Sequence, residues 1–468
     1  MMQATVLEVA EWCGAERVQP GSVEAGAVRL TGVSTDTRRI TEGQLFVPLR
    51  GDNFDGHDYI QAARDAGAAA SLWEAGRELP DTDIPLIFVE DTLRALQTLA
   101  EGYLRQLDVR IVAVTGSNGK TTTKDLISSV LATRYRVHKT EGNYNNHIGL
   151  PLTILSAPSD TEVLVLEMGM SGRGEIALLS NLAKPDIAVI TNIGEAHLLQ
   201  LGSRRNIARA KLEIIEGLQP GGALVYYGDE PLLFEELEEL TLPADTRLLT
   251  FGEGPGCSLA ADSIRIAAEG TAFSLTGEPG KPYELPIPGK HNAINALAAV
   301  AVGRLLELAR DDIFQGLKSA KLTGMRIERS MAKNGAVILN DAYNASPTSV
   351  KAAIDLVAEL TGSRRKWIVL GDMLELGPEE AEFHAETGRY LSPDKADRVL
   401  LYGPLSANTY EAAGRNYPDD CVFHFKDKSA LTKMLLDRLS PEDLVLVKAS
   451  RGMKMEEVVN ALQKGAGE

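Results

Sequence analysis

A glycine-punctuated segment that ends in Gly-Lys-Thr holds the residues with the clearest capacity for chemistry. The apolar run of residues 111–114 leads through Thr115 into Gly116, Ser117, Asn118, Gly119, Lys120, Thr121 and Thr122. Glycines let backbone N–H groups surround phosphate oxygens, while the Lys120 ammonium and the Thr121 hydroxyl suit the outer phosphates and Mg²⁺. The segment predicts a site for a nucleoside triphosphate and Mg²⁺ at a helix N-terminus.

This loop is shorter than the full phosphate-binding pattern G-x-x-x-x-G-K-[ST]. The first glycine of that pattern would fall at Val114, and the chain reads T-G-x-x-G-K-T instead. The alternative is a tight strand-to-helix turn that carries a chance lysine. The apolar strand before the loop and the helical stretch after it favour the nucleotide site.

Two further polar residues follow apolar runs that are typical of buried parallel strands. Glu167 follows Val163–Leu166, and His197 lies in the loop after Ile187–Ile190. Carboxyl ends of parallel strands share one sheet edge, so we expect Glu167, His197 and Thr121 to meet at one crevice. They suit Mg²⁺ beside a nucleotide, although imidazole also suits Mn²⁺. Taken singly, Glu167 could be a capping group and His197 an ordinary loop histidine.

Lys211 lies in an apolar stripe of a predicted helix, residues 204–218, for which Ser203 is the expected N-cap. The stripe consists of Ile207, Ala208, Ile214, Ile215 and Leu218. An amine at that place either extends to water or loses its charge through desolvation and becomes nucleophilic. A neutral amine can react with CO₂ to give a carbamate, which is a two-oxygen metal ligand.

Two other polar segments are candidates for binding a larger ligand. Residues 142–151 contain Asn143, Asn145 and Asn146, whose amides can donate to and accept from a hydroxyl-rich ligand or simply belong to an Asn-rich loop. Near the N-terminus, Ser34, Asp36, Thr37 and Arg38 combine short polar groups with a guanidinium that could grip a phosphate.

Composition excludes several classes of protein. A length of 468 residues with 44% hydrophobic residues predicts two to four domains, and a net charge of −17 argues against a nucleic-acid or anionic-membrane partner. Cys13, Cys257 and Cys421 form neither a disulfide framework nor a zinc motif, as expected in a reducing cytoplasm. Glu8 and Glu11 interrupt any secretory signal, and no apolar run reaches membrane-spanning length. We therefore expect a cytoplasmic protein.

The order of elements predicts an α/β protein with three domains, at residues 1–108, 109–322 and 323–468. The first contains a strand at 44–49 and helices at 59–68 and 93–104. In the second, strands at 163–166, 187–190 and 223–227 alternate with helices, short edge strands occupy 248–288, and a helix follows at 292–308. In the third, strands are expected at 336–339, 367–370, 398–402, 421–425 and 444–448. Apolar strands that alternate with helices indicate parallel sheets covered on both faces.

Two local features have plain interpretations. The third domain has no G-x-G-x-x-G motif, which argues against a dinucleotide there. The acidic run Glu235 to Glu239 is interpreted as a solvated helix face.

Over essentially its whole length the chain resembles the Mur ligase family. The resemblance rests on residues 34–38, 54–58, 115–124, 142–151, 167–169, 196–198, 288–292, 341–345 and 371–377. Several of these segments are similar to the members that add D-alanyl-D-alanine, and the Asp-Asn-Pro-Arg segment of the diaminopimelate- or lysine-adding members is absent. The resemblance implies three domains: one for a UDP-sugar peptide, a central P-loop ATPase with a parallel sheet, and a C-terminal Rossmann-like domain.

The resemblance also implies a role for each matching residue. It places ATP phosphates on Gly116 to Thr122, Mg²⁺ on Thr121, Glu167, His197 and a carbamylated Lys211, adenine near Asn292 and Asn295, the γ-phosphate near Arg326, and ribose near Asp341 and Tyr343. It places the UDP-sugar peptide near Ser34, Asp36, Thr37, Arg38, Asn143, Asn145 and Asn146, and the dipeptide near Lys448 and Ser450. Lys120, Glu167, His197, Lys211 and Arg326 are the implied catalytic residues.

At three places the chain departs from the family pattern. Met325-Arg326 replaces the usual Gly-Arg, Ser346-Pro347 replaces Asn-Pro, and Lys448-Ala449-Ser450 replaces Lys-Gly-Ser. Each change lies beside a residue to which the resemblance gives a role.

The implied reaction is ATP-dependent addition of D-alanyl-D-alanine to UDP-N-acetylmuramoyl-tripeptide through an acyl phosphate, with release of ADP and phosphate. The expected protein is a monomer that works in peptidoglycan synthesis without a nucleic-acid or membrane partner. A ligase of the same build with another acceptor, such as a folylpolyglutamate-type enzyme, is one alternative. A P-loop ATPase or kinase is the other. The sequence does not distinguish lysine from diaminopimelate as the third peptide residue.

Overall fold

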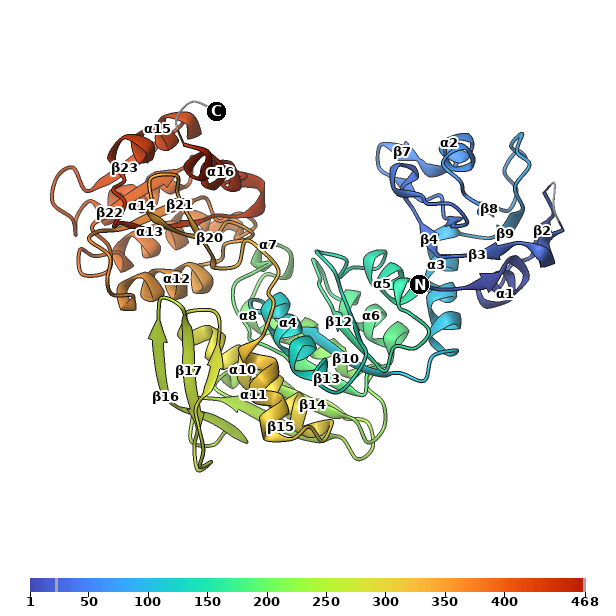
Figure 1. Cartoon of the computed structure of the whole chain (residues 1–468), viewed down its shortest axis with the longest axis horizontal. Coiled ribbons are helices and arrows are strands. Elements are labelled where there is room, and N and C mark those ends of the chain that lie inside the picture. Colours follow the sequence, from blue (N-terminus) through green and yellow to red (C-terminus); the bar gives the residue numbers. More distant parts are fainter. Residues whose placement is uncertain (22–23, 466–468) are drawn as a thin grey trace.

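The chain folds into three lobes that follow one another along the sequence, each with one main sheet (Figure 1). The computed structural model describes residues 1–21 and 24–465. The N-terminal and C-terminal lobes stand on opposite sides of the central one (Figure 1). No helix within the described ranges is both long enough and apolar enough to cross a membrane.

The N-terminal lobe is a five-stranded sheet in the order β2-β9-β8-β5-β4, parallel except for β2. Its elements are β1 (Ala4–Thr5), α1 (Val6–Trp12), β2 (Arg17–Gln19), η1 (Ala25–Ala27), β3 (Arg29–Leu30), β4 (Val33–Ser34), η2 (Thr37–Arg39), β5 (Leu45–Phe46), β6 (Arg50–Gly51), β7 (Phe54–Asp55), η3 (Gly56–Tyr59), α2 (Ile60–Asp65), β8 (Ala70–Glu74), β9 (Leu86–Val89) and α3 (Thr92–Leu104).

Two elements of this lobe are shorter than the sequence predicted. The strand expected at 44–49 is reduced to β5, because Pro48 has no N–H to donate to a ladder. The helix expected at 59–68 is reduced to α2: a 3₁₀ turn precedes it, and Gly67 follows in the left-handed region at φ +100°.

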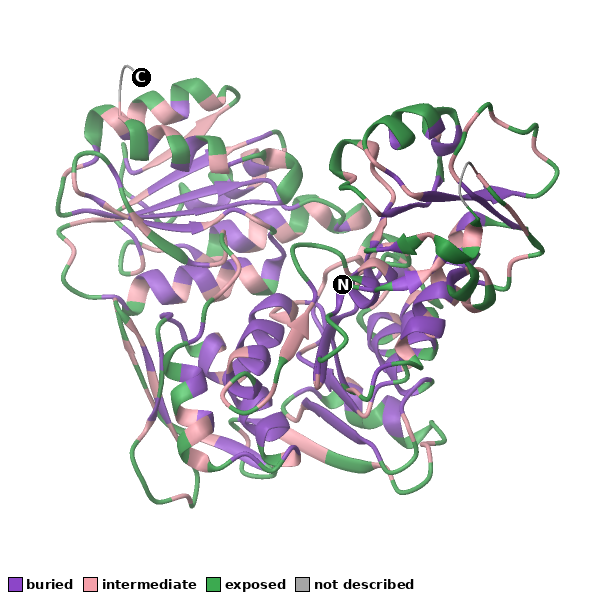
Figure 2. Cartoon of the chain, turned by 45° about the vertical axis from the view of Figure 1, so that its right-hand side comes forward, coloured by how far each residue is buried: buried purple, intermediate pink, exposed green. Residues whose placement is uncertain are grey.

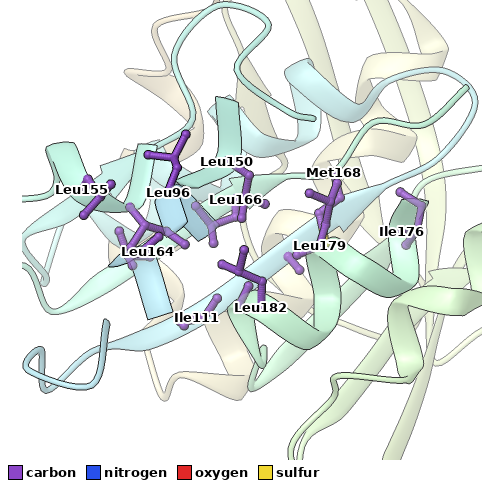
Figure 3. Close-up of a cluster of buried hydrophobic side chains, with 14 of the residues drawn as sticks. Leu96, Ile111, Leu150, Leu155, Leu164, Leu166, Met168, Ile176, Leu179 and Leu182 are labelled. Atoms are coloured by element: carbon purple, nitrogen blue, oxygen red, sulfur yellow. The ribbon is translucent and has the colours of Figure 1, made fainter. Parts of the chain in front are cut away.

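Helix α3 joins the N-terminal lobe to the central one. Leu96 of α3 packs in one apolar cluster with residues of the central sheet and its helices, including Leu150, Leu164 and Leu182 (Figure 3). All four side chains are buried. The two lobes therefore share a continuous core.

The central lobe is a nine-stranded sheet in the order β11-β12-β10-β13-β14-β15-β16-β17-β18. Strands β10 to β16 are parallel, and β17 and β18 are antiparallel additions at one edge, as expected for residues 248–288. The elements are β10 (Arg110–Thr115), α4 (Lys120–Leu131), β11 (Val137–Lys139), α5 (Gly149–Ser156), β12 (Val163–Glu167), α6 (Glu175–Ala183), β13 (Ile187–Ile190), α7 (Leu198–Leu201), α8 (Arg204–Leu212), η4 (Glu213–Ile215), β14 (Ala223–Tyr227), α9 (Pro231–Glu238), β15 (Arg247–Gly252), β16 (Leu259–Ala267), β17 (Gly270–Leu275), β18 (Tyr283–Leu285), α10 (Lys290–Leu305) and α11 (Arg310–Lys318).

The helix predicted at 204–218 ends at Leu212 and continues only as the 3₁₀ turn η4. Its next residues bond to helix α6 instead of extending the α-helix. The Glu213 carboxylate accepts from the N–H of Gly174, and the Ile214 carbonyl accepts from the Ser180 hydroxyl at 2.6 Å. Ser203 caps the helix as predicted, because its hydroxyl accepts from the Asn206 N–H at 3.2 Å.

The acidic run 235–239 is not simply a solvated face. Glu236 is 3% exposed and pairs with Arg205 and Arg209 of α8. Tertiary packing of α9 on α8 therefore overrode the local charge pattern at this one residue.

The helix predicted at 292–308 is shifted toward the N-terminus. It is present as α10, which ends at Leu305 before Glu307, a residue with φ +61°.

The C-terminal lobe is a six-stranded sheet in the order β19-β20-β24-β21-β22-β23, parallel except for β19. Its buried strands lie between helices whose outer surfaces are exposed (Figure 2). The elements are β19 (Glu328–Met331), β20 (Val337–Asp341), α12 (Pro347–Glu359), β21 (Lys366–Gly371), η5 (Gly377–Glu379), α13 (Glu380–Tyr390), β22 (Arg398–Tyr402), α14 (Ser406–Ala413), β23 (Val422–Phe425), α15 (Lys428–Arg438), β24 (Leu444–Lys448), η6 (Arg451–Met453) and α16 (Glu456–Lys464). The predicted strands are therefore present, with end shifts of a residue or two at several of them.

Candidate functional site

The phosphate loop connects β10 to α4, and two glycines give it its shape. Gly116 has φ +146° and Gly119 has φ +77°, conformations that side chains disfavour. A Cβ at Gly116 would lie 1.8 Å from the Thr191 hydroxyl, so only glycine fits. The loop is held by Asn192 after β13, whose carbonyl accepts from the Ser117 N–H and whose side chain accepts from the Asn118 N–H.

Lys120 begins helix α4 with its ammonium folded over the loop. Its Nζ donates to the Gly116 carbonyl at 2.8 Å. Burial lowers the pKa of Lys120, the Glu167 carboxylate opposes that shift, and Arg326 adds to it. Arg326, from the start of the C-terminal lobe, lines the same cavity as Lys120 and Glu167.

Glu167 is the last residue of β12, and its carboxylate lies beside the phosphate loop as predicted. It is 2% exposed, accepts from the Thr121 hydroxyl at 2.8 Å and accepts from the Asn145 amide at 2.8 Å. The Asn-rich segment and the start of α4 therefore converge on one carboxylate. In the described part of the chain, no group of three or more His, Cys, Asp or Glu side chains is placed to hold a metal alone.

Lys211 lies beneath this site with its side chain fully buried. Its Nζ has no hydrogen-bond partner among the residues that the structure describes. Burial lowers the pKa of Lys211 well below its ordinary value, Lys120 adds to the shift, and Glu167 opposes it. The alternative that the amine reaches water is wrong, and a neutral amine is accessible.

His197 stands at the start of α7 in the left-handed region, at φ +65°. Burial, with Lys211 and Lys120 nearby, lowers its pKa to about 4. Its imidazole is therefore neutral near pH 7 and free to act as a ligand. Its Nδ1 lies 3.4 Å from the Glu375 carboxylate of the C-terminal lobe.

A cavity of about 960 Å³ collects these groups between the central and C-terminal lobes. The predicted residues that line it are Ser117, Asn118, Gly119, Lys120, Thr121, Thr122, Asn143, Asn145, Asn146, Glu167, His197, Asn292, Asn295, Arg326, Asp341, Tyr343 and Lys448. The convergence expected from strand ends is thus present. Of the predicted residues within the described ranges, Ser34, Asp36, Thr37, Arg38, Gly116, Lys211 and Ser450 do not line it.

The far end of the cavity combines residues of α10 with residues of the C-terminal lobe. The Arg326 guanidinium lies over the Tyr343 ring at 4.3 Å, and Lys448 donates to the Asp341 carboxylate at 2.6 Å. His291, to which sequence reasoning gave no role, lines the same end. Burial lowers its pKa to about 4, against an opposing effect of Asp341.

The residues predicted in the N-terminal lobe lie elsewhere. Arg38 forms a two-pronged ion pair with Asp36, with both N–O distances 2.9 Å, although its side chain is 86% exposed. Its neighbour Arg39 donates to the Tyr144 hydroxyl at 2.8 Å. The segment around η2 therefore touches the Asn-rich segment of the central lobe.

Ser450 is buried and bonded within the C-terminal lobe. Its hydroxyl accepts from the Leu374 N–H at 2.9 Å and donates to the Ala345 carbonyl at 3.4 Å. These bonds fix the loop after β24 that follows Lys448.

Sequence reasoning gave no role to two residues that link the C-terminal lobe to the central lobe. The Ser346 hydroxyl donates to the Asn118 amide oxygen at 3.0 Å, and the Thr348 hydroxyl donates to Glu195 at 2.6 Å. Ser346 stands where the family pattern has Asn. That departure was the one signal in the sequence that pointed to this contact.

The departure at Met325 also has a structural meaning. Met325 has φ +60°, in the left-handed region where the usual glycine carries no steric cost. Ile327, two residues on, has φ +56°. The chain therefore turns sharply on both sides of Arg326.

Three models of Mur ligase domains match the chain. The family catalytic domain matches residues 29–104, the middle domain residues 114–303, and the glutamate ligase domain residues 325–451. The UDP-N-acetylmuramoyl-tripeptide–D-alanyl-D-alanine ligase of Bacillus subtilis (strain 168) is 49% identical, with 99% of each chain covered. That of Escherichia coli (strain K12) is 36% identical over 95% of this chain and 96% of its own.

Solved structures agree with the sequence comparison. A crystal structure of MurF from Acinetobacter baumannii has a TM-score of 0.88 at 28% identity and covers 99% of both chains. MurF ligase from Thermotoga maritima, in complex with ADP, has a TM-score of 0.80 at 32% identity, covering 92% of this chain and 97% of its own. With its site, its fold and its sequence all in agreement, the chain belongs to the Mur ligase family.

Proposed function

We propose that this protein joins D-alanyl-D-alanine to UDP-N-acetylmuramoyl-tripeptide while ATP is cleaved to ADP and phosphate. The main support is the 49% identity to a ligase of that name over 99% of both chains. The cavity adds independent support, because a phosphate loop, a strand-end carboxylate and an arginine of the C-terminal lobe surround one volume.

The alternatives have less support. A folylpolyglutamate synthase from Mycobacterium tuberculosis shares 19% identity at a TM-score of 0.60, which is a likeness of fold alone. A kinase would leave phosphate on its product, whereas a ligase releases it. A partner-binding ATPase would hydrolyse ATP without any UDP-sugar.

The reaction follows from the charges in the cavity. The tripeptide carboxylate attacks the γ-phosphorus of ATP, the bond to the β-phosphate oxygen breaks, and an acyl phosphate and ADP result. Lys120 and Arg326 face this volume and neutralise the oxygens of the transferring group. The dipeptide amine then attacks the acyl carbon, loses a proton, and expels phosphate as the amide bond forms. The C-terminal lobe over the cavity limits the access of water to the acyl phosphate.

Thr121, Glu167, His197 and a carbamylated Lys211 are the residues that we propose to hold Mg²⁺. The fit rests on the buried Lys211 Nζ without a partner in the described chain and on the Thr121–Glu167 pair at the cavity wall. Addition of the neutral amine to CO₂ and loss of a proton would give a carbamate with two ligand oxygens. When bound, Mg²⁺ would neutralise phosphate charge during transfer.

We also propose which residues contact the UDP-sugar peptide, the nucleoside and the dipeptide. We place the UDP-sugar peptide between η2, with Ser34, Asp36, Thr37 and Arg38, and the Asn-rich segment, with Asn143, Asn145 and Asn146. The Arg39–Tyr144 contact supports this, since it joins the two surfaces. We place nucleoside contacts at Asn292, Asn295, Asp341 and Tyr343, and dipeptide contacts at Lys448 and Ser450.

The expected organisation and setting complete the proposal. We infer domains at residues 1–108, 109–322 and 323–468, each containing one of the three main sheets. We infer further that the protein works as a monomer in the cytoplasm. Sedimentation at assay concentration tests whether the protein is a monomer. Cell fractionation tests whether it lies in the cytoplasm.

Trapping of the acyl phosphate tests the proposed reaction. With ATP and UDP-tripeptide but no dipeptide, added hydroxylamine should give a hydroxamate on the tripeptide. With D-alanyl-D-alanine, ADP, phosphate and UDP-pentapeptide should form in equal amounts. The lysine and diaminopimelate tripeptides, assayed side by side, identify the acceptor. ADP formation without any UDP-tripeptide, or a phosphorylated final product, would contradict the proposal.

A further inference from the structure

The linker between the central and C-terminal lobes is bonded to the helix that begins at the phosphate loop. Thr323 lies in this linker, between α11 and β19. Its N–H donates to Asp125 Oδ2 at 2.7 Å, and its hydroxyl donates to the same oxygen at 2.8 Å. Asp125 lies on α4 and is fully buried.

The other oxygen of Asp125 is held from the opposite side. Its Oδ1 accepts from Lys139 Nζ of β11 at 2.7 Å and lies 3.3 Å from Lys124 Nζ. Lys124 donates to the Thr140 carbonyl at 2.6 Å. The two ammonium groups therefore hold the carboxylate in one orientation, in which its Oδ2 faces Thr323.

Arg326 follows Thr323 by three residues, which span at most about 11 Å of chain. Between them Met325 adopts φ +60°, and its N–H donates to the Glu328 carboxylate at 2.9 Å, so this short stretch is sharply turned. The place where the linker is fixed on α4 thus limits where the Arg326 guanidinium can lie.

We propose that Asp125 and Thr323 form a positioning joint that holds Arg326 beside the phosphate loop during acyl-phosphate formation. The joint fixes the linker to the same helix that carries Lys120 and Thr121. Arg326, only three residues beyond the joint, is thereby kept close to the start of α4. This inference rests on the proposed ligase reaction and concerns the first of its two steps.

The test uses Thr323 rather than Asp125, because loss of the Asp125 charge would leave the buried Lys124 without its carboxylate partner. Thr323→Val keeps the shape and removes the hydroxyl bond, while Thr323→Ser keeps that bond. A hydrogen bond to a charged group supports an expected loss of roughly tenfold in single-turnover ADP formation for Thr323→Val. Thr323→Ser should retain the wild-type rate, and the KM for UDP-tripeptide should be unchanged in both variants.

A double-mutant cycle separates positioning from general stability. In an Arg326→Ala background, Thr323→Val should cause no further loss, because the residue that the joint positions is gone. Thr98→Val, which removes a threonine hydroxyl bond on α3 and leaves the Asp125–Thr323 bonds in place, serves as the matched control and should keep the ADP-formation rate.

The outcomes are distinct. Wild-type rates in Thr323→Val, or equal losses in the presence and absence of Arg326, would overturn the joint as a positioning device. A wild-type protein that forms no ADP with UDP-tripeptide would instead refute the ligase reaction, and the joint's proposed role with it.

Discussion

At the scale of single residues, the amine of Lys211 has the environment that most needs an explanation. It is fully buried, it has no partner among the described residues, and its pKa is lowered by burial and by Lys120. Retaining an uncompensated amine in the interior costs stability unless the amine is neutral or modified. Carbamylation would convert this unpaired amine of Lys211 into a group with two oxygens that could act together with Glu167.

Lys211→Ala is expected to lose activity by about 10²-fold or more, because a proposed metal ligand disappears. Formate or acetate should restore part of the activity by entering the space and supplying carboxylate oxygens. Initial rates of phosphate release, with and without each acid at constant ionic strength, measure the effect. Lys433→Ala, at an exposed position of α15, is the control and should keep full activity.

Full activity in Lys211→Ala would exclude the carbamate. Equal stimulation of the wild type and the alanine variant by the acids would show that rescue is not specific to the missing side chain.

At the scale of the element, the phosphate loop between β10 and α4 can adopt its shape because Gly116 leaves room for the Thr191 hydroxyl. Gly116→Ala would place its Cβ 1.8 Å from the Thr191 hydroxyl and so displace the loop. A displacement of about 1 Å at a reacting centre costs on the order of 10²-fold in rate. Titration calorimetry with ATP and steady-state kinetics should both show the loss.

Gly221→Ala is the matched control for Gly116→Ala. Gly221 also has positive φ, +74°, but a Cβ there meets nothing within 4 Å. It should lower stability slightly and leave ATP binding unchanged. Equal effects of the two substitutions on ATP binding would refute the steric explanation.

Helix α8 carries Lys211, and its first turn depends on Ser203. The Ser203 hydroxyl accepts from the Asn206 N–H at 3.2 Å, so Ser203→Ala should lower the free energy of unfolding by about 1 kcal/mol. Ser203→Asp keeps a capping oxygen and should retain stability. Urea unfolding of the three proteins measures the difference, and a Ser203→Ala variant as stable as the wild type would show that the cap is unimportant.

At the scale of the whole molecule, the half-buried imidazoles of His197 and His291 connect stability to pH. The pKa values of His197 and His291 are lowered to about 4, in both cases mainly by burial. In the unfolded chain an imidazole titrates near pH 6.5. Below about pH 6.5 the unfolded chain therefore binds more protons than the folded one, so the free energy of unfolding falls as pH decreases toward 4.

The urea midpoint of the ligand-free protein should accordingly fall between pH 7 and pH 5. His291→Gln should reduce this fall, because one of the imidazoles with a lowered pKa is absent. His147→Gln is the control, since His147 is exposed on the Asn-rich segment. A pH dependence that is identical in His291→Gln and wild type would show that His291 does not carry the effect.

Much of the central lobe could be predicted from local sequence. The strands at 187–190 and 223–227 were predicted with their observed ends, and Glu167 was placed correctly at the end of a strand. Such features depend on side-chain periodicity and on backbone geometry within a few residues, which the sequence states directly.

By itself, the sequence determined the phosphate loop, the alternation of strands and helices, and the position of Glu167 at a strand end. It left open whether the Lys211 amine is buried, which the structure shows. Only the tertiary structure decided which distant groups pair: Glu236 buried on α8, Ser346 on Asn118, and Thr323 on Asp125. The last two join residues about two hundred positions apart. Their contact energy depends on how whole lobes pack and exclude water, and no local pattern of residues encodes that packing.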